Sequence, residues 1–237
     1  MSNSWFQFKE FRINQGQCAM KVTTDACILG AWTPINQAFK NVLDIGAGTG
    51  LLSLMLAQRN QNINIDAIEL DPTAALQASQ NFKDSPWATR IKCCVADIRQ
   101  HEASAKYDLI ICNPPFFSNS LLGPTPTKNY ARHDVSLTSH QLFTKARSML
   151  TQEGYLSLLL PYKEYLQWRQ NSIESGLYES QCLYIKHTPA SPVKRVVTIL
   201  STTQKSSPNI TELVIKDYDG NYTNYFKELL SGYYLNL

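Results

Sequence analysis

The sequence predicts an α/β fold in which a seven-stranded, mostly parallel sheet carries helices on both faces. Two observations support this prediction. Short apolar runs alternate with helical patterns along most of the chain, which is typical of a parallel sheet covered by helices. The predicted strands are also nearly continuous apolar runs, as strands buried on both sides are.

The expected elements follow one another in a regular order. Strands are expected at residues 41–45, 63–70, 91–95, 107–112, 155–160, 178–186 and 195–202. Helices are expected at residues 23–32, 51–59, 139–150 and 162–175, and one more begins at Asp71 and Pro72. Asp71 suits the N-cap of that helix and Pro72 its first position. Residues 210–237 hold a strand-like run and a helix near 222–230, and the sequence alone does not place them.

The composition is typical of a globular protein, and the length predicts one domain spanning residues 1–237. Hydrophobic residues make up 43% of the chain and charged residues 17%, and the net charge of +3 permits an anionic partner without indicating one. The six cysteines form no Cys-x-x-Cys pair, so no metal site is expected. Neither a secretory segment nor a membrane span is expected, which favours a cytoplasmic protein. A monomer is the simplest expectation.

A glycine-rich turn stands between the first predicted strand and its helix. Asp44 is followed by Gly46, Gly48 and Gly50, which let the backbone turn tightly and approach a ligand closely. A dinucleotide fingerprint requires a third glycine where Leu51 stands. The turn resembles motif I of the Rossmann-like class I methyltransferases instead. That resemblance implies S-adenosyl-L-methionine as the cofactor, with Asp44 facing its methionine part.

Two further acids follow the next two predicted strands. Glu69 ends the second strand, about 20 residues beyond the turn, where an acid that binds a ribose is expected. Its carboxylate can accept hydrogen bonds from both ribose hydroxyls. Asp97 follows the third strand, and the resemblance implies that it accepts from the adenine amine of the cofactor. Three acids at successive strand ends favour a cofactor site over a coincidence.

The tetrapeptide from Asn113 to Phe116 directly follows the fourth predicted strand. Its sequence, Asn-Pro-Pro-Phe, resembles motif IV of the amino-methyltransferases. The Asn113 amide oxygen and the Pro114 carbonyl can each accept one hydrogen of an exocyclic amine. Pro114 and Pro115 stiffen the backbone, and Phe116 offers a face on which a base can stack, worth about 1–3 kcal/mol. The sequence predicts Asn113, Pro114 and Phe116 as the catalytic residues.

Basic and aromatic residues are interleaved in the loop of about 20 residues that follows, a length typical of functional loops. Such a loop beside an active site suits a nucleic acid strand. An ordinary solvated loop is the competing interpretation. We expect the substrate to contact Pro115, Phe117, Lys128, Arg132 and His133.

Over nearly its whole length the chain resembles the bacterial tRNA1(Val) (adenine-37-N6)-methyltransferases. The segments 17–32 and 131–133 narrow the resemblance to that family, and the motifs at 44–50 and 113–116 are common to many methyltransferases. The resemblance implies methylation of N6 of the adenine next to the anticodon of a valine tRNA, in a single-stranded loop where flipping a base out costs little. It also implies that residues 1–40 extend over the cofactor site, with Lys21, Thr24 and Asp25 near the methionine end.

Several alternatives remain open at this point. A protein glutamine N5-methyltransferase uses a similar motif, but the roughly 40 residues before Asn41 are too few for the helical domain such enzymes carry. An N6-adenine methyltransferase of another RNA or of DNA is a second alternative. Leu51, which replaces the third glycine, and the proline-rich tetrapeptide argue against a nicotinamide-dependent oxidoreductase. The intact Asn113 and Phe116 argue against a non-catalytic module that binds the cofactor or RNA.

Overall fold

The computed structural model describes residues 3–114, 137–204 and 206–237. Its strands are β1 (Trp5–Gln7), β2 (Arg12–Asn14), β3 (Asn41–Ile45), β4 (Asn64–Glu69), β5 (Ile91–Val95), β6 (Tyr107–Cys112), β7 (Leu150–Pro161), β8 (Tyr178–Lys186), β9 (Arg195–Ser201) and β10 (Asn209–Val214). Its helices are α1 (Thr24–Trp32), α2 (Leu51–Arg59), α3 (Pro72–Lys83), α5 (Ser139–Met149), α6 (Tyr162–Glu174) and α7 (Asn224–Leu230).

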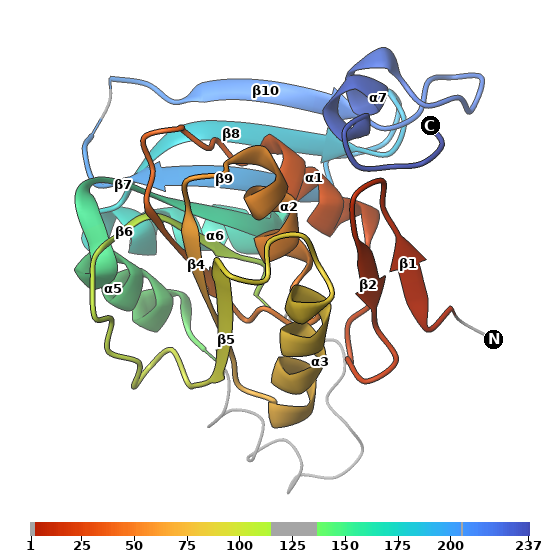
Figure 1. Cartoon of the computed structure of the whole chain (residues 1–237). Helices are drawn as coiled ribbons and strands as arrows, with labels where there is room; N and C mark the ends of the chain where they lie inside the picture. Colours follow the sequence, from red (N-terminus) through yellow and green to blue (C-terminus); the bar gives the residue numbers. More distant parts are fainter. Residues whose placement is uncertain (1–2, 115–136, 205) are drawn as a thin grey trace, which may run out of the picture.

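The main sheet of the described chain has eight strands in the order β10-β8-β9-β7-β6-β3-β4-β5 (Figure 1). Neighbouring strands run parallel, except that β9 lies antiparallel to both β7 and β8. The expected mostly parallel α/β fold is therefore confirmed. The sheet holds one strand more than the seven expected, because β10 adds parallel to β8 at one edge.

Helices cover both faces of this sheet. On one face, α1, α2, α3 and α7 pack over a core that includes Val42 and Leu109. On the other face, α5 and α6 pack over a core that includes Leu43 and Ile110. Successive strand residues thus enter opposite cores, as the pleat of a strand requires. This burial on both sides explains why central strands such as β3 and β6 are nearly continuous apolar runs in the sequence.

Local capping fixes where several helices begin. Asp71 caps α3 by accepting from the Thr73 backbone N–H at 2.8 Å, and Pro72 opens the helix, as the sequence predicts. Thr138 and Gln141 form a reciprocal capping box at the start of α5. Gly50 precedes α2 in a left-handed conformation. Among the described residues, no helix has both the length and the apolar character that crossing a bilayer requires.

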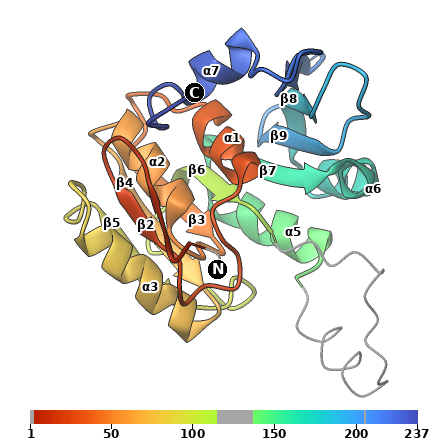
Figure 2. The ribbon, with the colours of Figure 1, turned by 90° about the vertical axis from the view of Figure 1, so that its right-hand side faces the viewer.

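Both ends of the chain lie on the side of the molecule that faces the viewer in Figure 2, the C-terminus beside α7 and the N-terminus lower in the view. The strands β1 and β2 form a small antiparallel hairpin that the sequence analysis did not predict. The Lys9 backbone N–H donates to the Tyr233 carbonyl at 2.8 Å. The Tyr233 hydroxyl in turn donates to the Met55 carbonyl of α2 at 3.0 Å. The C-terminal region therefore fixes the N-terminal hairpin against the core.

Candidate active site

The parallel strands β3, β4, β5 and β6 end at the same edge of the sheet, which is where open α/β sheets bind ligands. Their registers pair Ile45 with both Ile68 and Cys112, and Glu69 with Val95. The residues that follow these pairs are therefore neighbours. They are the glycine turn after β3, Asp97 after β5 and Asn113 after β6. In Figure 1 the carboxyl ends of β4 and β5 lie low in the view, beside the start of α3.

The glycine turn is open on one side and packed on the other. Gly46, Gly48 and Gly50 all have positive φ, at 71°, 54° and 81°, a conformation that favours glycine. A Cβ added to Gly46 or Gly48 would meet no described atom within 4 Å, whereas one added to Gly50 would come within 2.3 Å of Phe82 Cε1. The first two glycines therefore face space that a ligand can fill, and the third lets α3 pack closely.

Asp44 is fully buried at the end of β3. One carboxylate oxygen, Oδ2, accepts from the Ser53 hydroxyl at 2.7 Å and from the Ser53 backbone N–H at 3.2 Å. The other oxygen, Oδ1, is buried without a hydrogen-bond partner in the described chain. Loss of solvation raises the pKa of Asp44 to about 7, although the Ser53 bonds oppose this rise. An unsatisfied buried carboxylate oxygen is suited to a cationic ligand group.

Glu69 supports the turn from the neighbouring strand. Its Oε2 accepts from the Gly48 backbone N–H at 2.8 Å, and its Oε1 accepts from the Asp71 backbone N–H at 3.0 Å. Each carboxylate oxygen can accept a further hydrogen bond. Glu69 therefore both orients the glycine turn and keeps acceptor capacity for the hydroxyls of a ligand.

Asp97 has a partner that the sequence analysis missed. Arg99 Nε and Nη2 donate to its carboxylate at distances between 2.6 and 3.0 Å. The hydrogen bonds from Arg99 lower the pKa of Asp97 and hold the carboxylate ionised. The pair fixes the orientation of Asp97, whose remaining lone pairs are available to a donor such as an adenine amine.

Asn113 and Pro114 directly follow β6, so Asn113 lies beside Gly46 at the tips of two paired strands. Pro114 is buried and Asn113 is half-buried. The Asn113 amide oxygen is itself buried, and no described atom donates to it. The structure thus brings an open amide acceptor next to the glycine turn. The other predicted substrate-side residues, Pro115, Phe116, Phe117, Lys128, Arg132 and His133, lie outside the described residues.

The segment before α1 approaches the same edge. Asn14, shortly before this segment, and Thr49 of the glycine turn both accept from the same side chain, Asn81. Burial, together with the negative charges of Glu69 and Asp71, raises the pKa of the Cys18 thiol in this segment to about 11. Lys21 is exposed just before the helix, and Thr24 and Asp25 form its first turn. Asp25 Oδ2 lies 3.4 Å from Arg195 Nε, an ion pair that links α1 to the start of β9.

The side chains that orient the site residues are identified by the tertiary structure and not by a sequence motif. Ser53, Asn81 and Arg195 each hold a site residue or a neighbouring segment, and none of them stands in a recognisable sequence pattern. Arg99 could have been found, because an Asp carboxylate in a turn commonly accepts from the backbone N–H two residues on, as Asp97 does from Arg99 at 2.9 Å. No group of three or more His, Cys, Asp or Glu side chains in the described part of the chain is arranged to hold a metal ion.

The fold and this edge define a class I S-adenosylmethionine-dependent methyltransferase. Residues 32–173 match the family described as the methyltransferase small domain, to which the chain belongs. More closely, the chain is a member of the tRNA1(Val) (adenine(37)-N6)-methyltransferase family. It is 39% identical over 234 residues to that enzyme of Flavobacterium psychrophilum, covering 98% of this chain and 100% of the relative. It is 41% identical over 238 residues to that of Aliivibrio salmonicida, covering 99% of each.

Solved structures agree on the fold. The chain is similar to the crystal structure of a predicted O-methyltransferase from Agrobacterium tumefaciens, with a TM-score of 0.64 at 17% identity over 90% of this chain and 100% of the other. It is also similar to a class I S-adenosylmethionine-dependent methyltransferase from Listeria monocytogenes, with a TM-score of 0.57 at 13% identity over 79% of this chain and 62% of the other. At these identities the likeness concerns the fold alone.

Proposed function

We propose that this enzyme transfers a methyl group from S-adenosyl-L-methionine to N6 of adenine 37 in tRNA1(Val). The observation that carries the proposal is the open Asn113 amide oxygen beside the Gly46 turn, in a chain whose full-length relatives bear that enzyme's name. An amide oxygen is the acceptor that a neutral exocyclic amine needs.

The residues present fit the cofactor. The unsatisfied Asp44 Oδ1 would accept from its ammonium group, Glu69 would hold the ribose hydroxyls, and Asp97 would accept from the adenine amine. Gly46, Gly48 and Gly50 would let the backbone approach it. We also place the N-terminal extension, residues 1–40, over this site. In that arrangement Lys21, Thr24 and Asp25 would lie near the methionine end.

When bound, the cofactor supplies an electrophilic methyl group on a sulfonium. The protein's task is then to present the amine. Asn113 Oδ1 and the Pro114 carbonyl would each accept one amine hydrogen, which favours a tetrahedral nitrogen with its lone pair directed at the methyl group. Phe116 would stack on the base. Positioning and charge stabilisation supply the rate enhancement on this account, and the amine proton passes to solvent after transfer.

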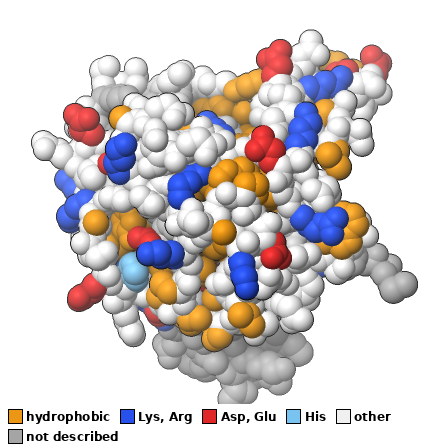
Figure 3. All heavy atoms as spheres, viewed as in Figure 1, with side chains coloured by type: hydrophobic (Ala, Val, Ile, Leu, Met, Phe, Trp, Pro, Cys, Tyr) orange, Lys and Arg blue, Asp and Glu red, His pale blue; other side chains and the backbone are white. Residues whose placement is uncertain are grey.

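The tRNA itself would be held by residues of the loop after the motif. Pro115, Phe117, Lys128, Arg132 and His133 are the proposed contacts to the anticodon loop. Over the described part of the face in Figure 3, acidic and basic side chains are intermixed, in keeping with the mild net charge of +3. We propose a monomer that acts in the cytoplasm, and sedimentation equilibrium tests the oligomeric state.

Nucleoside mass spectrometry on individual tRNAs from a deletion strain tests the proposal. We expect N6-methyladenosine to disappear from one valine tRNA and to return when the wild-type gene is supplied. The gene for the Asn113→Ala variant should fail to restore it. Persistence of the modified nucleoside in that tRNA without this gene would overturn the proposed substrate.

A further inference from the structure

Asn81 lies between the glycine turn and the N-terminal segment, and it binds both. It is 1% exposed, near the end of α3. Its Nδ2 donates to the Thr49 carbonyl at 2.8 Å and to the Asn14 carbonyl at 2.9 Å. Its Oδ1 accepts from the Asn14 backbone N–H at 3.0 Å. Both amide hydrogens and the oxygen of this side chain are therefore used.

These three hydrogen bonds reach backbone atoms of two segments far apart in the sequence. Thr49 lies between Gly48 and Gly50, so its carbonyl sets the orientation of the turn's last peptide. Asn14 is the last residue of β2 and directly precedes the segment that leads to α1. A side chain that satisfies both backbones at once makes the position of one depend on the position of the other.

Gln15 continues the connection. It is 5% exposed, and its Oε1 accepts from the Val22 backbone N–H at 2.9 Å, while its Nε2 donates to the Asn3 carbonyl at 3.0 Å. The chain between Gln15 and Val22 is thus closed into a loop whose base is held by Asn81. Cys18, which is buried, lies within that loop.

We propose that Asn81 is a positioning residue for the cofactor, joining the segment 16–22 to the glycine turn so that both sides of the cofactor site are held in register. This inference rests on the proposed cofactor site but goes beyond it, because Asn81 itself touches no expected ligand group. The connection runs from the Thr49 carbonyl through Asn81 and Asn14 to Gln15 and Val22. Loss of this connection separates the segment 16–22 from the glycine turn.

Two readouts test this inference on the full-length chain. The first is the dissociation constant for S-adenosyl-L-homocysteine by calorimetry, and the second is hydrogen exchange of the Asn14 and Val22 amides without ligand. Asn81→Ala removes three buried hydrogen bonds, and binding should weaken roughly tenfold if the free energy of about one of them acts on the cofactor site. It should also speed exchange at both amides. Asn81→Asp should weaken binding more, because a carboxylate would face two carbonyl oxygens.

Matched controls separate positioning from general loss of stability. Asn14→Ala keeps every Asn81 bond, since these reach only the backbone of residue 14, and should leave both readouts unchanged. Ser180→Ala removes a buried hydrogen bond to the Ile199 carbonyl in another part of the sheet and should leave binding unchanged. A folded Asn81→Ala variant with normal affinity and normal Val22 exchange would overturn the inference.

A second variant pair keeps the test decisive if Asn81→Ala does not fold. Gln15→Ala should free the Val22 amide and weaken binding, whereas Gln15→Glu retains the acceptor and should preserve Val22 protection. Equal Val22 exchange in these two variants would contradict the proposed connection. The exchange measurement needs no ligand, so it tests the connection independently of the proposed function. If the wild-type protein bound S-adenosyl-L-homocysteine but did not methylate tRNA, only the proposed function would be contradicted.

Discussion

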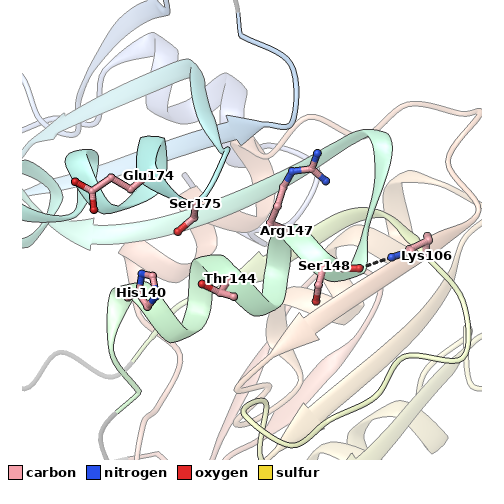
Figure 4. Close-up of a pocket in the computed structure, with 7 residues that line it drawn as sticks. All are labelled: Lys106, His140, Thr144, Arg147, Ser148, Glu174 and Ser175. Atoms are coloured by element: carbon pink, nitrogen blue, oxygen red, sulfur yellow. Dashed lines mark hydrogen bonds between the residues drawn. The ribbon is translucent and has the colours of Figure 1, made fainter.

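Two polar regions of this enzyme differ in what their side chains already bind. At the carboxyl edge, Asp44 Oδ1 and Asn113 Oδ1 are buried and have no described partner. Over α5, a surface hollow of about 460 Å³ presents exposed groups that water can satisfy, among them His140 and Arg147 (Figure 4). In that hollow Lys106 donates to the Ser148 carbonyl.

The difference shows which observation marks a functional site. A buried acceptor without a partner costs about 1–3 kcal/mol, so a folded protein retains few of them. Gln58 Oε1 and His101 Nε2 are also buried without a partner in the described chain, so Asp44 Oδ1 and Asn113 Oδ1 mark a site because both lie at the ends of paired strands beside the glycine turn. An exposed cation in a hollow carries no such cost. The size of a cavity is therefore a weaker guide here than the hydrogen-bonding state of its walls.

The largest effect is expected from Asn113→Ala. Removal of the amide oxygen should lower kcat for tRNA methylation by roughly 10²–10³, the range seen when one preorganised polar group is lost from an active site. Affinity for S-adenosyl-L-homocysteine should stay within about twofold, since Asn113 is assigned to the amine rather than to the cofactor. Single-turnover methylation and calorimetry measure the two quantities. An unchanged kcat would contradict the assigned role.

Asp44→Asn should weaken cofactor binding and remove its pH dependence. A cationic ligand group needs the ionised carboxylate, so wild-type affinity should rise as the pH increases from 6 to 8, through the raised pKa of about 7. The charge of Glu69 also raises the pKa of Asp44. Burial raises the pKa of the Cys93 and Cys112 thiols, so these groups stay neutral and do not titrate over this pH range. Calorimetry across this pH range gives the test, and an equally steep profile in Asp44→Asn would assign the titration to another group.

The same substitution should stabilise the ligand-free protein at high pH. Because the folded pKa of Asp44 lies above its ordinary value of 3.8, the native state holds the proton more tightly, and unfolding free energy falls as pH rises from about 4 to 7. At pH 8 this costs at most about 4 kcal/mol, which Asp44→Asn would recover. Denaturant melts of both proteins at pH 5 and pH 8 measure the difference, and a gap that does not widen with pH would contradict the burial argument.

Glu69→Ala should have an intermediate effect. The Gly48 and Asp71 amides would lose their acceptor, and the expected ribose contact would disappear, so affinity for S-adenosyl-L-homocysteine should fall at least roughly tenfold. Glu69→Gln keeps one acceptor oxygen and should lose less. Calorimetry ranks the three proteins. If Glu69→Ala bound the ligand as tightly as the wild type, the ribose assignment would be wrong.

The smallest effect is expected in the hollow over α5. Arg147→Ala and His140→Ala remove exposed side chains, so the stability change should stay within about 0.5 kcal/mol. Affinity for S-adenosyl-L-homocysteine should not change. A clear loss of cofactor affinity in either variant would remove the distinction between the two regions.

Most strands of the sheet could be predicted from the sequence, because the residue pattern that marks a strand lies within the strand itself. The strands at 41–45, 91–95, 107–112 and 178–186 have the predicted bounds. For 41–45 and 107–112 the signal is a short, nearly continuous apolar run, which marks a buried strand. The hairpin β1–β2 was missed because each strand has only three residues, too few to show alternation. The place of β10 depends on its pairing with β8, a tertiary fact with no local signature.

The residues of the site also divide into those that the sequence predicted and those that it did not. The glycine turn, Glu69 and Asn113 were predicted because parallel topology brings strand ends together. Their supporting partners were not, since Ser53 and Asn81 reach the site only through helix packing. The ligand-binding roles of all the predicted site residues stay predictions, and Phe116, Lys128, Arg132 and His133 also lie outside the described residues.

The most direct test of the central claim is methylation in vitro with S-adenosyl-L-methionine carrying a deuterated methyl group. Unmodified tRNA1(Val) transcript would be incubated with the wild-type or Asn113→Ala protein, and the products mapped by nuclease digestion and mass spectrometry. The account predicts labelled N6-methyladenosine at position 37 with the wild type and almost none with the variant. Label at another nucleoside, or equal label from both proteins, would contradict it.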